Sequence, residues 1–95
     1  MSYVCLVRFA WDPKKAATNL RKHQVSFEEA ATALADPLGL EKEDAIDPAR
    51  TVVVCMSDRP RLLLCVYAEI DEDTYRIISA RRATAHERRV YEEGH

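Results

Sequence analysis

The chain has 95 residues, of which 32% are charged, and its formal net charge is −2. This length fits one domain over residues 1–95 and is too short to enclose a deep pocket, so we expect any active site to be a shallow surface groove. No run of about 18 apolar residues occurs, which argues against a membrane-spanning helix, and residues 4–7 lack the preceding basic segment of a signal peptide.

Three helices are predicted from the residues that precede them. A short polar side chain at the N-cap accepts hydrogen bonds from the first unpaired backbone N–H groups of a helix. We expect helices at about residues 13–23, from residue 27 to the Asp36-Pro37 dipeptide, and from residue 85 to about Gly94. The N-cap signals are Asp12 before Pro13, Ser26 with Glu29 three residues later, and Thr84 with Glu87 three residues later.

Strands are predicted at residues 4–7, 38–44, 51–57, 61–69 and 75–80. The segment 61–69 is apolar through most of its length, as a central strand buried on both faces would be. Residues 44–50 are predicted to form a loop. The order of elements gives an α+β fold, with two N-terminal helices packed on a small, mainly antiparallel sheet and a C-terminal helix.

Side-chain alternation along the last strand predicts which of its residues share a face of the sheet. Arg76, Ile78 and Ala80 are expected on one face, and Tyr75, Ile77 and Ser79 on the other. An arginine on a sheet face needs a partner, and Glu69 on the neighbouring strand is a candidate for a cross-strand ion pair.

The three cysteines, Cys5, Cys55 and Cys65, lie in apolar runs and form no Cys-x-x-Cys pair. Their odd number and their spacing argue against a disulfide framework or a zinc site, so we expect buried thiols in a reducing cytoplasm. Only two glycines are present, which leaves almost no material for a phosphate-cradling loop. Neither a metal nor a cofactor is expected.

Charges are distributed unevenly along the chain. Residues 75–91 carry five arginines and a histidine, whereas acids cluster at 41–47 and 69–73. Arginine presents a planar fork of donors that matches phosphate, and we favour this role for Arg76, Arg81 and Arg82. For Arg88 and Arg89 we favour a solvated helix face, paired with glutamates one turn later. Such a split surface could bind a polyanion on one side and a basic partner on the other.

Two motifs, in this order, resemble one known family over nearly the whole chain. The first comprises residues 9–16 (FAWDPKKA), 19–23 (NLRKH) and 25–30 (VSFEEA), and the second comprises residues 76–84 (RIISARRAT) with Glu87, Arg88, Tyr91 and Glu92. They resemble the opening and closing signatures of the BrnT family. The resemblance implies a toxin of a bacterial type II toxin–antitoxin pair, similar in fold to RelE ribonucleases, that cleaves RNA without a metal.

The resemblance also implies a partner, a BrnA-like ribbon-helix-helix antitoxin through which the toxin would contact DNA only indirectly. Four positions depart from the family pattern: Ala10, Gln24, Pro60 and Ile70. Gln24 stands where glycine is common, and Ile70 stands where arginine is frequent near the groove. Two interpretations follow. One is an active endoribonuclease, and the other is a weak or inactive homologue that acts as an antitoxin-binding co-repressor.

RNA cleavage by attack of the 2′-hydroxyl needs a base and cations that stabilise the charge developing on the phosphoryl oxygens. We expect Arg76, Arg81 and Arg82 to supply the cations. Glu69 or His23 could be the base, although His23 could instead cap the first helix, whose negative end it occupies.

Four further residues are candidates for binding RNA. Tyr67 could stack on a base, although a strand tyrosine more often packs in the core. Lys14, Lys15 and Lys22 could steer RNA, and the alternative for each is a solvated face of the first helix.

Overall fold

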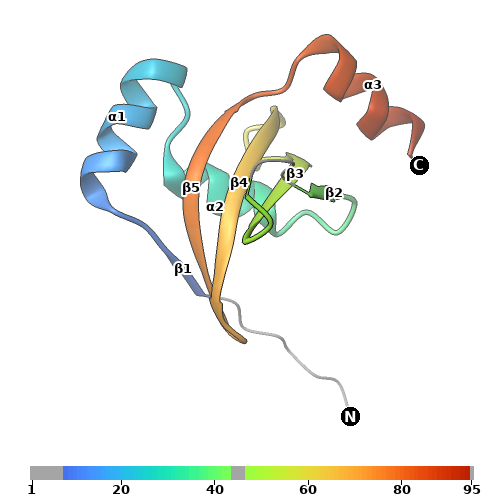
Figure 1. Ribbon diagram of the computed structural model, residues 1–95. Coiled ribbons are helices and arrows are strands. Elements are labelled where there is room, and N and C mark those ends of the chain that lie inside the picture. Colours follow the sequence, from blue (N-terminus) through green and yellow to red (C-terminus); the bar gives the residue numbers. More distant parts are fainter. Residues whose placement is uncertain (1–7, 44–46, 95) are drawn as a thin grey trace.

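The structure is a computed structural model that describes residues 8–43 and 47–94 (Figure 1). Its elements, in chain order, are β1 (Arg8–Ala10), α1 (Pro13–His23), α2 (Phe27–Leu34), β2 (Leu40–Glu43), β3 (Arg50–Met56), β4 (Leu62–Asp71), β5 (Thr74–Arg82) and α3 (Ala85–Glu93). The predicted α+β class is confirmed. The strand predicted at residues 4–7, the thiol of Cys5 and residues 44–46 of the predicted loop lie outside the described residues.

The five strands form one mixed sheet in the order β1-β5-β4-β3-β2. β1 runs parallel to β5, whereas the β5–β4, β4–β3 and β3–β2 pairs are antiparallel. β4 therefore lies in the middle of the sheet, and its first four residues are all buried. This confirms the central strand that the apolar run predicted, and β1 and β2 are the short strands at the two edges.

Local capping signals fix where α1 and α3 begin. The carboxylate of Asp12 accepts a hydrogen bond from the backbone N–H of Lys14 at 2.8 Å, and Pro13 follows in the first turn. At α3 the backbone N–H of Glu87 donates to the Thr84 hydroxyl at 3.2 Å, and the Thr84 N–H donates to the Glu87 carboxylate at 2.9 Å. Both halves of the predicted capping box are therefore present.

The side chain of Glu29, in the first turn of α2, forms hydrogen bonds with residues outside that helix. Its buried carboxylate accepts hydrogen bonds from Arg61 Nε at 2.9 Å and from the Ser57 hydroxyl at 2.7 Å. The Arg61 guanidinium also donates to the carbonyl of Gln24, just after α1, at 3.3 Å. The hydrogen bonds from Arg61 are the main reason that the pKa of Glu29 lies below its ordinary value of 4.5. Glu29 and Arg61 thus join α1, α2 and the β3–β4 turn.

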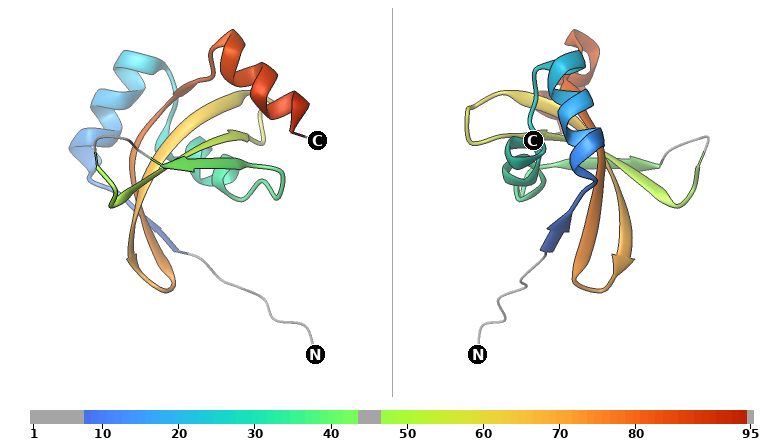
Figure 2. Two further views of the ribbon diagram at one scale, coloured as in Figure 1. Left: turned by 45° about the vertical axis from the view of Figure 1, so that its right-hand side comes forward. Right: turned by 90° about the vertical axis from the view of Figure 1, so that its left-hand side faces the viewer.

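Two apolar clusters lie on opposite faces of the sheet, which we call the α2 face and the α3 face. The α2-face cluster includes Phe27, Ala30, Ala33, Val53, Cys55, Leu63, Cys65, Tyr67, Ile77 and Ala80. The α3-face cluster consists of Val52, Val54, Leu62, Leu64 and Tyr91. Cys55 and Cys65 are free, buried thiols, as predicted. α1 lies along β5, on the side opposite to α3 (Figure 2).

An extra residue, Ile78, enters β5 where the register between β4 and β5 shifts. Such a β-bulge changes which following side chains share a face. Ile77 and Ala80 consequently both pack in the α2-face cluster. The predicted alternation, which grouped Ala80 with Arg76 and Ile78, is wrong because it assumed a regular strand.

Register also separates Arg76 from Glu69. Arg76 lies opposite Ala68, whereas Glu69 lies opposite Tyr75, so the two charged side chains emerge on opposite faces of the sheet. Within the described residues Arg76 makes no ion pair. The predicted cross-strand pair between Arg76 and Glu69 is therefore wrong.

Helix α1 ends at a residue in the left-handed conformation. Gln24 is the C-cap, with φ 58° and ψ 33°, and its backbone N–H donates to the carbonyl of Leu20 at 2.9 Å. Glycine adopts this conformation without the steric cost that a Cβ atom brings. The glutamine noted in the sequence as a departure from the family thus occupies a position whose backbone favours glycine.

Candidate functional site

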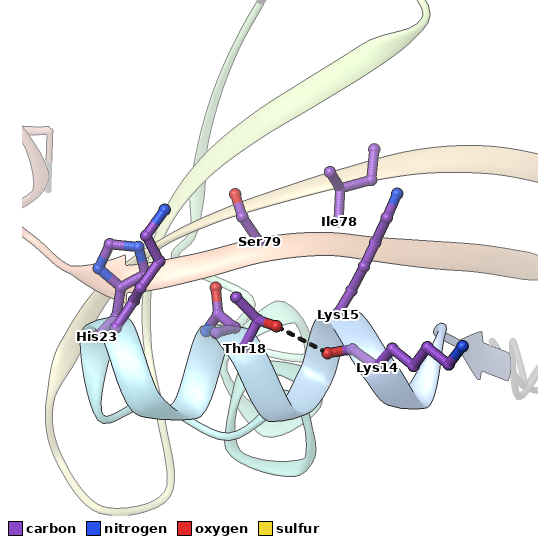
Figure 3. A pocket seen from close by; sticks show the side chains of 8 residues that line it. Lys14, Lys15, Thr18, His23, Ile78 and Ser79 are labelled. Carbon is purple, nitrogen blue, oxygen red and sulfur yellow. Dashed lines mark hydrogen bonds between the residues drawn. The ribbon is translucent and has the colours of Figure 1, made fainter.

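Two adjoining depressions, each of about 310 Å³, run along the junction of α1 and β5. The first is lined by Lys14, Lys15, Thr18, Asn19, Lys22, His23, Ile78 and Ser79. The second is lined by Ala10, Trp11, Asp12, Lys15, Arg76, Ile77 and Ile78. Lys15 and Ile78 belong to both, so we treat them as one feature, the α1–β5 groove. In Figure 3 the side chains of Lys15 and His23 extend from α1 toward β5, where Ser79 lies.

Helical spacing places the cations of α1 on the groove. Lys14, Thr18 and Lys22 are four residues apart, and Lys15 precedes Lys22 by seven, so all four lie on neighbouring rows of one helix surface. His23 completes this row in the last turn of α1. The three lysines are exposed, and their ammonium groups are therefore free to meet a ligand in solvent.

One buried amide holds α1 against β5. Asn19 is the only buried residue of α1, and its side-chain N–H groups donate to the carbonyls of Ala80 at 2.8 Å and Val25 at 2.9 Å. The backbone N–H of Ala80 in turn donates to the Asn19 side-chain oxygen at 3.2 Å. The amide side chain therefore pairs with the Ala80 peptide as a neighbouring strand would, and it fixes the position of the groove wall.

Arg76 brings an exposed guanidinium to the second depression. The carboxylate of Asp12 lines the same depression, but it serves as the N-cap of α1. Within the described lining of the groove, three lysines and Arg76 therefore face a single carboxylate. The groove is a cationic surface beside a histidine, which suits a phosphate-bearing ligand.

Arg81 has a different environment, because it is bound to α3. Its Nη1 and Nη2 donate to the two carboxylate oxygens of Glu87, each at 2.9 Å, and Nη1 also donates to the Arg82 carbonyl at 3.1 Å. These bonds are the chief reason that the pKa of Glu87 is lowered to about 2. The fork of Arg81 thus joins the end of β5 to the first turn of α3.

The remaining arginines of the predicted phosphate edge are exposed. Arg82 lies at the end of β5, and Arg88 and Arg89 lie on α3. Within the described part of the chain, neither Arg88 nor Arg89 pairs with Glu92 or Glu93, in contrast to the prediction. Both are nonetheless on a solvated helix face, as expected.

Tyr67 and Glu69 lie away from the groove. Tyr67 packs in the α2-face cluster, and its hydroxyl donates to Glu41 at 3.3 Å. Burial, followed by the nearby charge of Glu41, raises the pKa of Tyr67 to about 12. Glu69 is exposed on the same face, opposite Tyr75. The structure does not bring these two residues together with Arg76 and His23.

Residues 11–87 match the sequence model of a family described as the ribonuclease toxin BrnT of type II toxin–antitoxin systems. The chain belongs to the BrnT family. The crystal structure of the Brucella abortus ribonuclease toxin BrnT superimposes with a TM-score of 0.68 at 18% identity, covering 82% of this chain and 97% of that one. This likeness extends the agreement to the fold. A comparison with curated proteins finds no match.

Membership of the BrnT family, which is described as a family of ribonuclease toxins, supports a toxin role in a type II system, and such a system includes an antitoxin partner. Five residues predicted as site residues lie along one groove: Lys14, Lys15, Lys22, His23 and Arg76. Thr18, Asn19 and Ser79 also line it and were not predicted. Asn19 could have been noticed, because an asparagine inside a helix is unfavourable unless its side chain has a specific partner.

Among the described residues, no group of three or more histidine, cysteine, aspartate or glutamate side chains is placed to hold a metal ion. None of the helices in the described ranges is long and apolar enough to cross a membrane.

Proposed function

We propose that this BrnT-family chain is a metal-independent endoribonuclease that binds and cleaves RNA in the α1–β5 groove. The observation that carries the proposal is one shallow cationic surface made of two adjoining depressions that share Lys15, with His23 lining the first and Arg76 lining the second. Cleavage of RNA through its 2′-hydroxyl needs both a phosphate-binding surface and a group that takes a proton.

His23 acts as the general base in this mechanism. Its imidazole takes the proton of a 2′-hydroxyl, and the 2′ oxygen attacks the adjacent phosphorus to form a 2′,3′-cyclic phosphate. The bond from phosphorus to the 5′ oxygen breaks, and that oxygen takes a proton from water. Arg76 donates to the phosphoryl oxygens as their charge grows, which is where a preorganised donor lowers the barrier most.

The lysines of α1 bind the RNA backbone. Lys15 and Lys22 are seven residues apart, which is about 10 Å along a helix axis and matches roughly three nucleotides of a stacked strand. Arg82, exposed at the end of β5, adds to the positive field. Arg81 acts indirectly, because its ion pair with Glu87 holds α3 on the sheet.

The antitoxin partner in this proposal is a BrnA-like ribbon-helix-helix protein that neutralises the toxin in the cytoplasm. Contact with DNA then comes only through the antitoxin.

Purified protein and a labelled RNA, incubated in EDTA, test the mechanism. We expect wild type to give fragments ending in a 2′,3′-cyclic phosphate. Arg76→Ala should slow cleavage by about 10²–10³-fold, because it removes one charge-stabilising donor. His23→Ala should slow it by about 10²–10⁴-fold, because it removes the base. Arg89→Ala is the matched control, since it removes an exposed arginine of α3 and should leave the rate unchanged.

Inducible expression of the same four proteins in bacteria links this chemistry to growth. Arrest with RNA decay should appear for wild type and Arg89→Ala and disappear for the two groove variants. If cleavage survives both His23→Ala and Arg76→Ala, the groove mechanism is wrong. A folded wild-type protein that neither cleaves RNA nor arrests growth would instead favour the co-repressor interpretation.

A further inference from the structure

A second pocket, of about 230 Å³, lies on the α2 face of the sheet, beyond the C-terminal end of α2. We call it the tyrosine pocket. Tyr67 and Tyr75 from the two long strands form part of its lining, and Asp36 and Glu41 supply its charged groups. The α1–β5 groove shares no lining residue with it.

The aromatic part of the lining is preorganised. The rings of Tyr67 and Tyr75 are stacked, with centroids 4.6 Å apart and an angle of 26° between their planes. Phe9 packs edge-on against Tyr75 with a centroid separation of 6.2 Å. Tyr67 is only 8% exposed, so its ring position is fixed by the core. The face of such a ring attracts a cation.

The charged part of the lining is entirely acidic. Glu41 is exposed, and one of its oxygens accepts the Tyr67 hydroxyl. The Asp36 carboxylate accepts hydrogen bonds from the backbone N–H groups of Leu38 and Met56 and from the Tyr91 hydroxyl. Glu69, opposite Tyr75, adds a third carboxylate to the same face.

No lysine, arginine or histidine lines the pocket in the described part of the chain. The ion pairs of that part involve Asp47, Glu29 and Glu87, and so none of them uses Glu41 or Glu69. A stacked aromatic surface beside the carboxylates of Glu41 and Glu69, which enter none of these ion pairs, repels RNA and suits a cation.

We propose that the tyrosine pocket binds an arginine side chain of the antitoxin. A guanidinium is planar, stacks on aromatic rings and pairs with carboxylates through a fork of donors, so it satisfies both parts of the lining at once. The inference rests on the antitoxin partner of the proposed function and adds the chemistry by which one of its side chains is recognised. In the proposed function RNA binds in the α1–β5 groove, whose lining is cationic, whereas the lining of the tyrosine pocket is acidic.

Two capped peptides test the pocket directly, one with a central arginine and one with citrulline in its place. Citrulline keeps the shape of arginine and removes its charge. We expect the arginine peptide alone to shift the NMR resonances of Tyr67, Tyr75 and Glu41. No shift up to about 10 mM peptide, equal shifts with citrulline, or displacement of the peptide by an oligoribonucleotide would each overturn the proposal.

Glu41→Gln removes one charge of the pocket, and Glu72→Gln, an exposed acid at the β4–β5 turn, is its matched control. We expect Glu41→Gln to weaken binding of the arginine peptide, and of a BrnA-like antitoxin, on the order of tenfold, because it removes a hydrogen-bond acceptor that is charged. Glu72→Gln should bind as wild type does. Equal affinities for the two variants would overturn the proposal.

RNA cleavage separates this inference from the proposed function. Glu41 lies outside the α1–β5 groove, so Glu41→Gln should cleave RNA at the wild-type rate while it binds the antitoxin more weakly. If the wild type itself does not cleave RNA, the ribonuclease mechanism is contradicted. The peptide measurement then still decides whether the tyrosine pocket binds arginine.

Discussion

The backbone conformation of Gln24 is strained, and its side chain does not offset this conformational free energy. Its φ of 58° lies in the left-handed region, and its side chain is exposed. A residue with a Cβ atom loses roughly 1–2 kcal/mol there, whereas glycine does not. The bond that Arg61 donates at this position goes to the Gln24 carbonyl, which every residue has.

We therefore expect Gln24→Gly to stabilise the fold by about 0.5–1 kcal/mol. This value is the strain that glycine relieves minus the extra conformational entropy that glycine has in the unfolded chain. Urea unfolding should show a higher midpoint with an unchanged slope. Gln24→Ala is the control, since alanine keeps the Cβ atom and should bring no gain. A midpoint that falls for glycine would show that the glutamine side chain itself stabilises the helix end.

Glu29 links stability to pH. Because Arg61 lowers its pKa in the folded state below 4.5, the ionised carboxylate favours the folded state. This contribution is fully present above pH 4.5 and is lost as the pH falls through the lowered value. Since the Glu29 side chain is 3% exposed and that of Arg61 is 22% exposed, solvent screens the pair only in part.

Glu29→Gln should reduce the free energy of unfolding at pH 7 by about 2–3 kcal/mol, because Arg61 loses a charged partner in a mostly buried site. Below pH 4.5 the difference from wild type should shrink. Chemical denaturation at pH 7 and at pH 3 measures both values. A difference that does not change with pH would contradict the assignment to Glu29, and Glu28→Gln, on the exposed side of α2, serves as the control.

At the scale of elements, α1 is attached to the sheet mainly by the Asn19 amide and by the partly buried Trp11 and Ala16. Asn19→Ala would leave the carbonyls of Val25 and Ala80 without a donor they now have. We expect a loss of about 2–3 kcal/mol, as for buried polar groups deprived of a partner.

Hydrogen exchange can locate this loss. Amides of α1 should exchange faster in Asn19→Ala than in wild type by a larger factor than those of α2, and RNA cleavage should weaken because the lysines lose their fixed place beside β5. Leu20→Ala changes a neighbouring exposed residue of α1 that lies outside the groove lining, and it should do neither. Equal acceleration in α1 and α2 would show that Asn19 stabilises the whole fold and not this contact.

The three helices could be predicted because their signals are local: Asp12, Ser26 and Thr84 each bond within their own first turn. The groove could be predicted only in part. Its lysines share a helix face, but the contact of Asn19 with Ala80 joins positions 61 apart in the chain. No local pattern specifies such a contact.

The errors have the same physical origin. The bulge at Ile78 depends on how β4 and β5 pair, and one extra residue moves Ala80 to the other face. Arg81 was predicted to bind phosphate, but in the folded protein its guanidinium pairs with Glu87. Residue type indicates what a side chain can bind, whereas tertiary packing determines what it does bind.

At the scale of the whole molecule, β5 separates two charge environments. Arg76 contributes to the cationic groove, while its neighbour Tyr75 lines the acidic pocket on the other face. Alternation along one strand thus gives a chain of net charge −2 both a surface for a polyanion and a surface for a cation. The net charge alone would have argued against RNA binding.

Asp36 belongs to the tyrosine pocket and also accepts the Tyr91 hydroxyl of α3 at 2.7 Å. One carboxylate therefore contributes both to the lining of the pocket and to the docking of a helix. Any occupant that strengthens or weakens the bond to Tyr91 changes the free energy with which α3 rests on the sheet. By thermodynamic reciprocity, the docking of α3 changes the affinity of that occupant by the same factor. Arg81 pairs with Glu87 and so joins α3 to the end of β5. Occupancy of the pocket and the contacts at that end of β5 therefore both depend on the equilibrium by which α3 docks on the sheet.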